Sequence, residues 1–303
     1  MTYQGIFKKA KENALQKLTE YYEKKYTPEK ACEKAQGIIE KLLVPAEKYN
    51  IRNGNPTLSD VYVRLLLSCQ NRVMMPNVIK FDNPNTQKNF KQVLPNNDDG
   101  ANYDYKKIAQ SSSDKIFEEF AGKFGLNKDS KNELWHSFAE SVVDAAKFIK
   151  RFKSVEDFKN SLEIIANRFP CSMALPRLIS GEIRGMGEAL ACDFLKEIGC
   201  IEYAKPDEHI RVYVEKIINN FKDEEDKNYK KLTNKQILDE MQKMAEENNV
   251  TSFAMDKILW LVASGKYYDP DGEEPMIKIK NNKNELRNEF LETLKKSMST
   301  RVI

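Results

Sequence analysis

Cysteine is scarce and scattered in this chain of 303 residues. Five cysteines are present, none of them forms a C-x-x-C pair, and none follows Cys200. An odd and scattered set is typical of reduced thiols, often buried as small apolar side chains, and not of a disulfide framework or a zinc motif. We therefore expect no metal and no cofactor.

Long apolar runs are also absent. No stretch approaches the roughly eighteen uncharged apolar residues that a membrane-spanning helix needs. The Lys- and Glu-rich stretch from Met1 to Tyr22 lacks the apolar core of an export signal. These absences favour a protein of the cytoplasm or the nucleoid, with no membrane partner.

A large charge of one sign is missing as well. Lys and Arg number 49 and Asp and Glu number 46, so the formal net charge is only +3. Strong global attraction to nucleic acid is thereby excluded, and any DNA binding must depend on local basic patches and oriented backbone dipoles. One such patch spans residues 147–153; the alternative is a solvated helix end that the helix dipole favours.

Helical periodicity runs through nearly the whole chain. The predicted helices span about residues 5–25, 28–49, 57–72, 114–124, 130–153, 155–167, 171–180, 188–198, 207 onward, 233–247, 251–265 and 284–298. Alternating strand patterns are almost missing, and only residues 276–280 favour a short strand. The Asn-rich stretch 82–114 is interpreted as a polar insertion or mobile loop, and loops of that length are often functional.

Two features of the second half carry chemical information. Gly185 and Gly187 flank Met186 ahead of an amphipathic run. Without Cβ atoms, backbone N–H groups there can face outward and bind an anion at a helix N-terminus. A short Gly-x-Gly is a weak signal, however, and a loop into a helix with no ligand remains the alternative.

The second feature is Asp207, which follows Pro206 and precedes another helical pattern. An acid in that position is first of all a helix N-cap, which contributes roughly 1 kcal/mol. The other reading is a functional carboxylate. The residues alone leave both readings open.

Taken together, the hairpin, its helix and the acid resemble the helix-hairpin-helix DNA glycosylases of the HhH-GPD superfamily, nearest to the 8-oxoguanine and endonuclease III-like branches. In that family a hydrophobic-Gly-hydrophobic-Gly hairpin grips a DNA phosphate, and a downstream Pro/Val-Asp-x-His segment supplies the catalytic acid. Gly187 and Asp207 stand at the family's spacing, and residues 205–212 read Lys-Pro-Asp-Glu-His-Ile-Arg-Val. The resemblance implies that Arg184, Gly185, Met186 and Gly187 bind DNA phosphate.

Two further segments resemble the family less closely. Residues 65–72 are similar to a Leu-Ser-x-Gln helix end whose loop enters the duplex, which implies a wedge of Gln70, Asn71 and Arg72. The alternative is that these polar side chains solvate a helix end. Residues 255–261 are similar to a closing helix of the 8-oxoguanine branch.

The resemblance also implies an architecture. We expect an all-α fold with two helical lobes flanking a DNA-binding cleft, and with the catalytic Asp207 at the lobe junction. One lobe would combine residues 1–56 and 205–303, and the other would span 57–204, with the helix-hairpin-helix at about 171–199. The implied partner of this monomer is double-stranded DNA. The four-cysteine iron–sulfur loop of some relatives is absent, because no cysteine follows Cys200.

The chemistry that follows is base excision. A glycosylase flips a nucleotide out of the duplex, and Asp207 would stabilise the oxocarbenium-like sugar and orient a water. Bifunctional relatives have a lysine two residues after the second glycine, where this chain has Ala189. Alanine cannot form a Schiff base, so we expect a monofunctional enzyme that leaves an abasic site. Glu188 is a weaker candidate for positioning water, since a first-turn Glu also suits the helix dipole.

The base pocket and the class of activity are less defined by the sequence. Trp260 is the best candidate for stacking on a flipped base, most plausibly an oxidised purine, with Tyr213, Tyr267 and Tyr268 behind it, although Trp260 could equally be core packing. His209 is expected to support the helix. The alternative function is a non-catalytic DNA-binding protein of the same fold that uses the hairpin as a phosphate grip.

Overall fold

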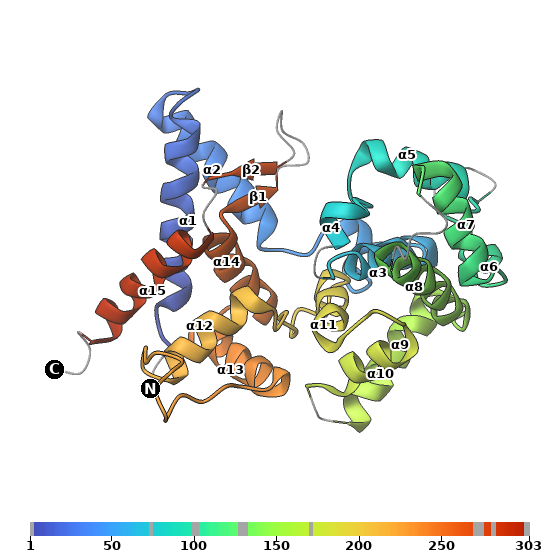
Figure 1. The fold of residues 1–303 in the computed structure, drawn as a ribbon. Coiled ribbons are helices and arrows are strands. Elements are labelled where there is room, and N and C mark those ends of the chain that lie inside the picture. Colours follow the sequence, from blue (N-terminus) through green and yellow to red (C-terminus); the bar gives the residue numbers. More distant parts are fainter. Residues whose placement is uncertain are drawn as a thin grey trace. The chain divides into compact units, whose positions relative to one another are not determined.

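The computed structural model describes residues 3–72, 75–97, 103–126, 133–169, 172–268, 276–279 and 283–299. The chain divides into two compact units, Met1–Pro45 with Ile201–Ile303 (unit 1) and Ala46–Cys200 (unit 2). Residues 46–56, which we expected in the first lobe, belong to unit 2, and residues 201–204 belong to unit 1. Both units consist almost entirely of helices, so the all-α prediction is confirmed (Figure 1).

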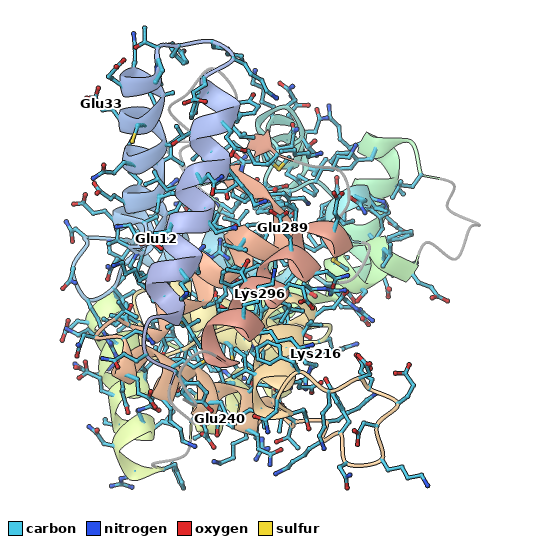
Figure 2. All side chains as sticks on the ribbon, turned by 90° about the vertical axis from the view of Figure 1, so that its left-hand side faces the viewer. Glu12, Glu33, Lys216, Glu240, Glu289 and Lys296 are labelled. Carbon is cyan, nitrogen blue, oxygen red and sulfur yellow. The ribbon has the colours of Figure 1, made fainter. Side chains whose placement is uncertain are left out.

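Unit 1 is organised around one apolar helix. Its elements are α1 (Ile6–Tyr22), α2 (Pro28–Leu42), α12 (Glu208–Ile218), α13 (Asn234–Glu247), α14 (Ser252–Ser264), β1 (Lys266–Tyr268), β2 (Met276–Lys278) and α15 (Lys283–Ser299). Helix α14 is buried on nearly every side and contacts α1, α12, α13 and α15. Charged side chains such as Glu12, Glu33 and Lys296 lie on the outer faces of the surrounding helices (Figure 2).

The two strands form a small antiparallel hairpin that pairs Tyr268 with Met276. The expected strand at 276–280 is confirmed for Met276–Lys278. Its partner, Lys266–Tyr268, was not predicted because three residues are too few to display an alternating pattern.

Unit 2 is a group of helices in which α3 (Leu58–Cys69) packs against α8 (Glu133–Lys150) and α11 (Glu188–Glu197). Its other elements are η1 (Glu47–Tyr49), α4 (Met75–Val78), α5 (Pro84–Val93), α6 (Tyr105–Ile108), α7 (Ser113–Phe124), α9 (Val155–Arg168) and α10 (Ala174–Glu182). Helix α3 begins with a capping box between Thr57 and Asp60 and contacts both α8 and α11. These contacts place α3, α8 and α11 around one core.

The interpretation of residues 82–114 as a mobile loop was wrong. This stretch contains α5 and α6, and Asn96 pairs with Tyr103 in an isolated bridge. Phe90 is fully buried, with its ring centroid 5.0 Å from that of Phe81 and 5.3 Å from that of Phe120. Asn83 caps α5, so asparagines that looked like loop residues include a helix start. Residues 98–102 of this stretch lie outside the described part of the chain.

Candidate nucleic-acid and catalytic site

The glycine hairpin of unit 2 joins α10 to α11 in a tight turn. The N–H of Met186 donates to the carbonyl oxygen of Ile183 at 3.2 Å, and both side chains are buried. Gly185 has a φ of +79°, a left-handed conformation that favours glycine. Gly187, in contrast, has an ordinary φ of −80° and forms the N-cap of α11. The apolar residues of the hairpin thus point inward while its glycine backbone stays at the surface.

Helix α8 holds this hairpin in place. The hydroxyl of Ser141 donates to the carbonyl oxygen of Arg184 at 2.7 Å. The N–H of Arg184 donates to Asp144 Oδ2 at 3.3 Å. A Cβ added at Gly185 would lie 3.0 Å from Ser141 Oγ and 3.1 Å from Ser137 Oγ, so any other residue would have to displace these hydroxyls slightly.

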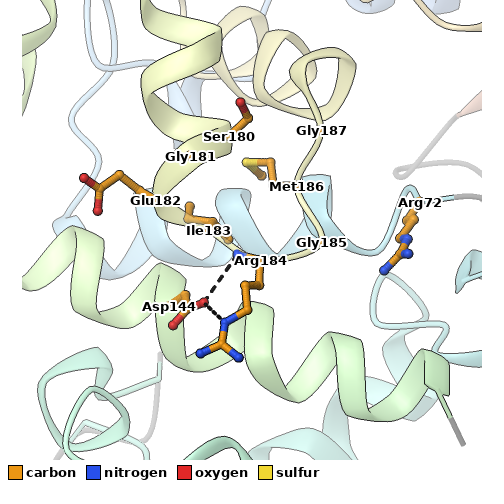
Figure 3. A pocket seen from close by; sticks show the side chains of 10 residues that line it. All are labelled: Arg72, Asp144, Ser180, Gly181, Glu182, Ile183, Arg184, Gly185, Met186 and Gly187. Atoms are coloured by element: carbon orange, nitrogen blue, oxygen red, sulfur yellow. Dashed lines mark hydrogen bonds and ion pairs between the residues drawn. The ribbon is translucent and has the colours of Figure 1, made fainter.

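The hairpin borders a pocket of about 490 Å³ (Figure 3). It is lined by residues 180–187, by Asp144 and by Arg72, which lies three residues after the end of α3. Arg72 is exposed and donates to the hydroxyl of Ser137. An exposed guanidinium beside N–H groups at a helix N-terminus is an arrangement that suits a phosphate.

Two other candidates near the hairpin are already engaged by ion pairs. Arg184 Nη1 lies 2.8 Å from Glu140 Oε1, and Arg184 Nε lies 3.3 Å from Asp144 Oδ2. Arg177 Nε lies 3.0 Å from Glu188 Oε1. Binding of a phosphate by Arg184, or of a water by Glu188, would therefore compete with these pairs. The exposed surface around the hairpin carries both signs of charge, in agreement with the small net charge of the chain.

The three predicted wedge residues have different environments. Gln70 is 2% exposed, and its Oε1 accepts from the N–H of Phe81 at 2.7 Å. It is therefore a core residue that ties α3 to the following turn, and its assignment to the wedge was wrong. Asn71 and Arg72 are exposed, so both retain the access that a wedge requires.

Asn71 belongs to a polar network between α3 and α11. Asp193 Oδ2 accepts hydrogen bonds from Ser68 at 2.8 Å, Arg64 at 3.1 Å and Asn71 at 3.3 Å. Asp193 is 5% exposed, and a buried carboxylate is stable only when such partners satisfy it. The network fixes the C-terminal end of α3 relative to the helix that follows the hairpin.

In unit 1, Asp207 is the N-cap of α12, which confirms the simpler of its two readings. Its Oδ1 accepts from the N–H of His209 at 3.0 Å and of Ile210 at 3.2 Å. The cap thus uses one carboxylate oxygen, and the other, Oδ2, lies 3.6 Å from Lys205 Nζ. The Asp207 side chain is 19% exposed, which allows solvent or a ligand to reach it.

The segment before Asp207 is a tight turn. The N–H of Asp207 donates to the carbonyl oxygen of Lys205 at 2.8 Å, which is the i to i+2 bond of a γ-turn centred on Pro206. The N–H of Lys205 donates to Asp256 Oδ1 of α14, also at 2.8 Å. Asp256 is 2% exposed.

Aromatic rings gather near the start of α12. The rings of Trp260 and Tyr268 stack with centroids 6.1 Å apart and an interplanar angle of 17°. Trp260 also contacts the ring of His209 edge to face, at 6.4 Å and 83°. Tyr268 is 41% exposed, so the stack reaches the surface of unit 1. Trp260 is therefore a partly exposed side chain at the edge of the core.

Two of the three tyrosines predicted for the base pocket are core residues. Tyr213 and Tyr267 are both 0% exposed, and burial raises the pKa of each hydroxyl well above its ordinary value. The hydroxyl of Tyr267 donates to the carbonyl oxygen of Ala14 at 3.4 Å. A flipped base cannot stack on either ring without rearrangement of unit 1. Tyr268, one residue from Tyr267, is the tyrosine that reaches the surface.

Sequence reasoning missed the buried carboxylates Asp193 and Asp256. A signal was present, because each acid stands among apolar residues of a helix, in Leu190–Leu195 and in Met255–Leu261. A buried acid in such a run needs partners, and the hydrogen-bond donors described above lie far away in the sequence, although Lys196 Nζ also lies 3.9 Å from Asp193 Oδ1. Across the described ranges, no cluster of His, Cys, Asp or Glu could hold a metal ion, and no helix is long and apolar enough to cross a membrane.

Comparison with known proteins gives structural similarity only. No family model matches the sequence, and no curated protein matches it. The fold is similar to an 8-oxoguanine glycosylase/lyase of Methanocaldococcus jannaschii in complex with a 15mer DNA containing 8-oxoguanine, at 18% identity, a TM-score of 0.47 and coverage of 84% of this chain and 99% of that one. A second structure, the 8-oxoguanine DNA glycosylase of the same organism, gives 18% identity, a TM-score of 0.48 and coverage of 84% and 95%. At this identity the similarity assigns no activity.

Proposed function

We propose that the protein is a monofunctional DNA glycosylase that flips out an altered base and hydrolyses its N-glycosidic bond. Asp207 carries this proposal. The cap fixes its carboxylate through Oδ1 and leaves Oδ2 beside Lys205, while the side chain stays partly exposed. A rigidly oriented carboxylate can stabilise an oxocarbenium-like sugar and orient the attacking water.

The hairpin supplies the proposed grip on the DNA backbone. No side chain caps α11, which is also true of α1, α2 and α10, whereas Asp, Ser or Thr side chains cap α9, α12, α13 and α14. A Cβ added at Gly187 would meet no described atom within 4 Å, so the fold itself does not require glycine there. A phosphate that approaches the backbone closely does require it. Arg72 adds the local positive charge.

The monofunctional part of the proposal depends on Ala189. This residue lies in the first turn of α11, where a lysine would supply an amine nucleophile. Water then becomes the nucleophile, and the product is an abasic site in an unbroken strand. The exposed stack of Trp260 and Tyr268 provides the flat apolar surface that an extruded base requires.

The test uses duplexes that each contain one altered base, including 8-oxoguanine, followed by alkali to cleave abasic sites. Scission should appear only after alkali, and Asp207→Asn should abolish it, because the asparagine oxygen still caps α12 but carries no charge. Glu208→Gln is the matched control, since the Glu208 side chain is 79% exposed and should not affect the rate. Equal scission by wild type and Asp207→Asn would refute the proposed role of Asp207.

The second candidate is a DNA-binding protein of the same fold without catalysis. The observation that favours it is the uncapped helix beside Arg72, which binds phosphate without any need for Asp207. Binding of every duplex with similar affinity, with no alkali-sensitive site on any of them, would decide for this candidate.

A further inference from the structure

We propose that Asp256 is a positioning residue that sets the orientation of the Asp207 carboxylate. The inference rests on the proposed function, because it concerns how Asp207 is held for catalysis. Asp256 reaches Asp207 through the backbone of the Lys205–Pro206–Asp207 turn. The link runs from Asp256 Oδ1 to the N–H of Lys205, and from the carbonyl oxygen of Lys205 to the N–H of Asp207.

Helix α14 holds the backbone segment that leads into α12 at two positions. The carbonyl oxygen of Ile201 accepts from the N–H of Phe253 at 3.0 Å. Four residues later, the N–H of Lys205 donates to Asp256 Oδ1 at 2.8 Å. The segment 201–205 therefore runs along the first turns of α14 and is tied to it at both ends.

The turn transmits this constraint to Asp207. Pro206 restricts one backbone angle, and the bond from the N–H of Asp207 to the carbonyl oxygen of Lys205 closes the γ-turn. The two bonds to Oδ1 of Asp207 then orient its carboxylate along α12. Each of the three residues Lys205, Pro206 and Asp207 is thus restrained, either by a backbone hydrogen bond or by the pyrrolidine ring of the proline.

A second contact comes from the same face of α14. Asp256 and Trp260 are four residues apart and therefore lie one above the other on the helix. The Trp260 ring packs edge to face on the ring of His209, and the backbone N–H of His209 donates to Asp207 Oδ1. One face of α14 thus contacts Lys205, the first residue of the turn, and His209, two residues after Asp207.

Because Asp256 is buried, its replacement by a side chain that cannot accept a hydrogen bond should be destabilising. The carboxylate is 2% exposed, so water cannot easily replace it as a partner for the Lys205 N–H. A backbone donor left unpaired in such a site would be relieved by movement of the turn. Small displacements of a catalytic group are enough to slow chemistry strongly, about 100-fold for roughly 1 Å.

The inference predicts a defined pattern for two variants. Asp256→Ala should lower the single-turnover excision rate by roughly 10- to 100-fold, with the dissociation constant for the duplex nearly unchanged. Asp256→Asn should restore most of the rate, because its Oδ1 can accept the same hydrogen bond. Amide hydrogen exchange at Lys205, measured without DNA, should be faster in Asp256→Ala and close to wild type in Asp256→Asn.

Asn248→Ala is the control for general damage to unit 1. Asn248 also holds a backbone donor of another segment, since its Oδ1 accepts from the N–H of Gly5 at 2.9 Å. Its loss should lower stability without changing the excision rate. A wild-type rate in folded Asp256→Ala, or a rate loss in Asp256→Asn equal to that of the alanine variant, would overturn the inference.

Failure of the proposed function is distinguishable from failure of this inference. If wild type cleaves no duplex, the glycosylase proposal fails on its own. Exchange at Lys205 still decides the structural part: faster exchange in Asp256→Ala supports the constraint on Asp207, and unchanged exchange overturns it.

Discussion

The hydroxyl of Ser141 donates a hydrogen bond to the carbonyl oxygen of Arg184 at 2.7 Å, so α8 holds the backbone of the glycine hairpin directly. The same hydroxyl lies 3.0 Å from the position that a Cβ of Gly185 would take. Packing against α8 therefore helps to set the conformation of the hairpin. This arrangement lets the roles of the two glycines be separated by experiment.

Gly185→Ala should mainly lower stability, whereas Gly187→Ala should mainly weaken DNA binding. Alanine at Gly185 must adopt a φ of +79° and should lower the free energy of unfolding by about 1–2 kcal/mol or more. Alanine at Gly187 should cost less than about 1 kcal/mol as a poorer N-cap, while its methyl group blocks a phosphate. Urea unfolding and fluorescence anisotropy with a labelled duplex measure the two effects. Unchanged duplex binding by Gly187→Ala would argue against the phosphate grip.

Ala189→Lys should convert the proposed hydrolase into an enzyme that nicks the strand. The first turn of α11 would then present an amine where bifunctional relatives have one, and the amine can attack the sugar to form a Schiff base. Borohydride should trap a covalent adduct with the variant and none with the wild type. Trapping by the wild type would disprove the monofunctional assignment. Ala189→Met controls for side-chain size.

Trp260→Ala should weaken selection of the altered base, because it removes half of the exposed stack with Tyr268. We expect a higher dissociation constant for the damaged duplex and little change for an undamaged one, since phosphate contacts remain. Trp260→Phe should restore part of the preference for the damaged duplex over the undamaged one. Competition binding with the two duplexes measures this preference. Equal loss for both duplexes would indicate that Trp260 acts only in packing.

Tyr213→Phe should leave excision unchanged and should not lower stability. The Tyr213 ring is 0% exposed, and its hydroxyl has no hydrogen-bond partner within the described residues. Removal of a buried and unsatisfied polar group is neutral or stabilising, by about 1 kcal/mol. Thermal unfolding and the excision assay check this prediction. A loss of activity would restore Tyr213 as a residue of the base pocket.

The cysteines should react with alkylating reagents in a defined order. Burial raises the pKa of the Cys69 thiol to about 12, so in the folded protein at pH 8 it stays protonated and inert. Among the four cysteines that the structure describes, Cys32 is exposed and should react first, as peptide mapping by mass spectrometry would show. Unfolding returns the pKa of Cys69 to about 8.5, so denaturant should expose it to alkylation. By the same linkage, stability falls as the pH rises above that value, because only the unfolded chain releases the proton.

Much of the helical fold could be predicted because its signals are local. The proline behind Thr27, the capping box at Thr57 and the apolar periodicity each act within a few residues. The stretch 82–114 was misread for the same reason. Its asparagines suggested a loop, whereas its helices depend on Phe90 meeting Phe81 and Phe120 from other segments.

The residues of the candidate site also separate into those that local sequence predicted and those that tertiary contacts decided. The sequence by itself determined the hairpin, the missing lysine at Ala189 and the cap at Asp207, because each is a property of a few consecutive residues. Only the tertiary structure decided that Gln70, Tyr213 and Tyr267 are core residues. It alone joined Asp256 to Lys205, which lies 51 residues away along the chain. Burial and hydrogen-bond partners depend on which segments meet in space, and no local pattern specifies that.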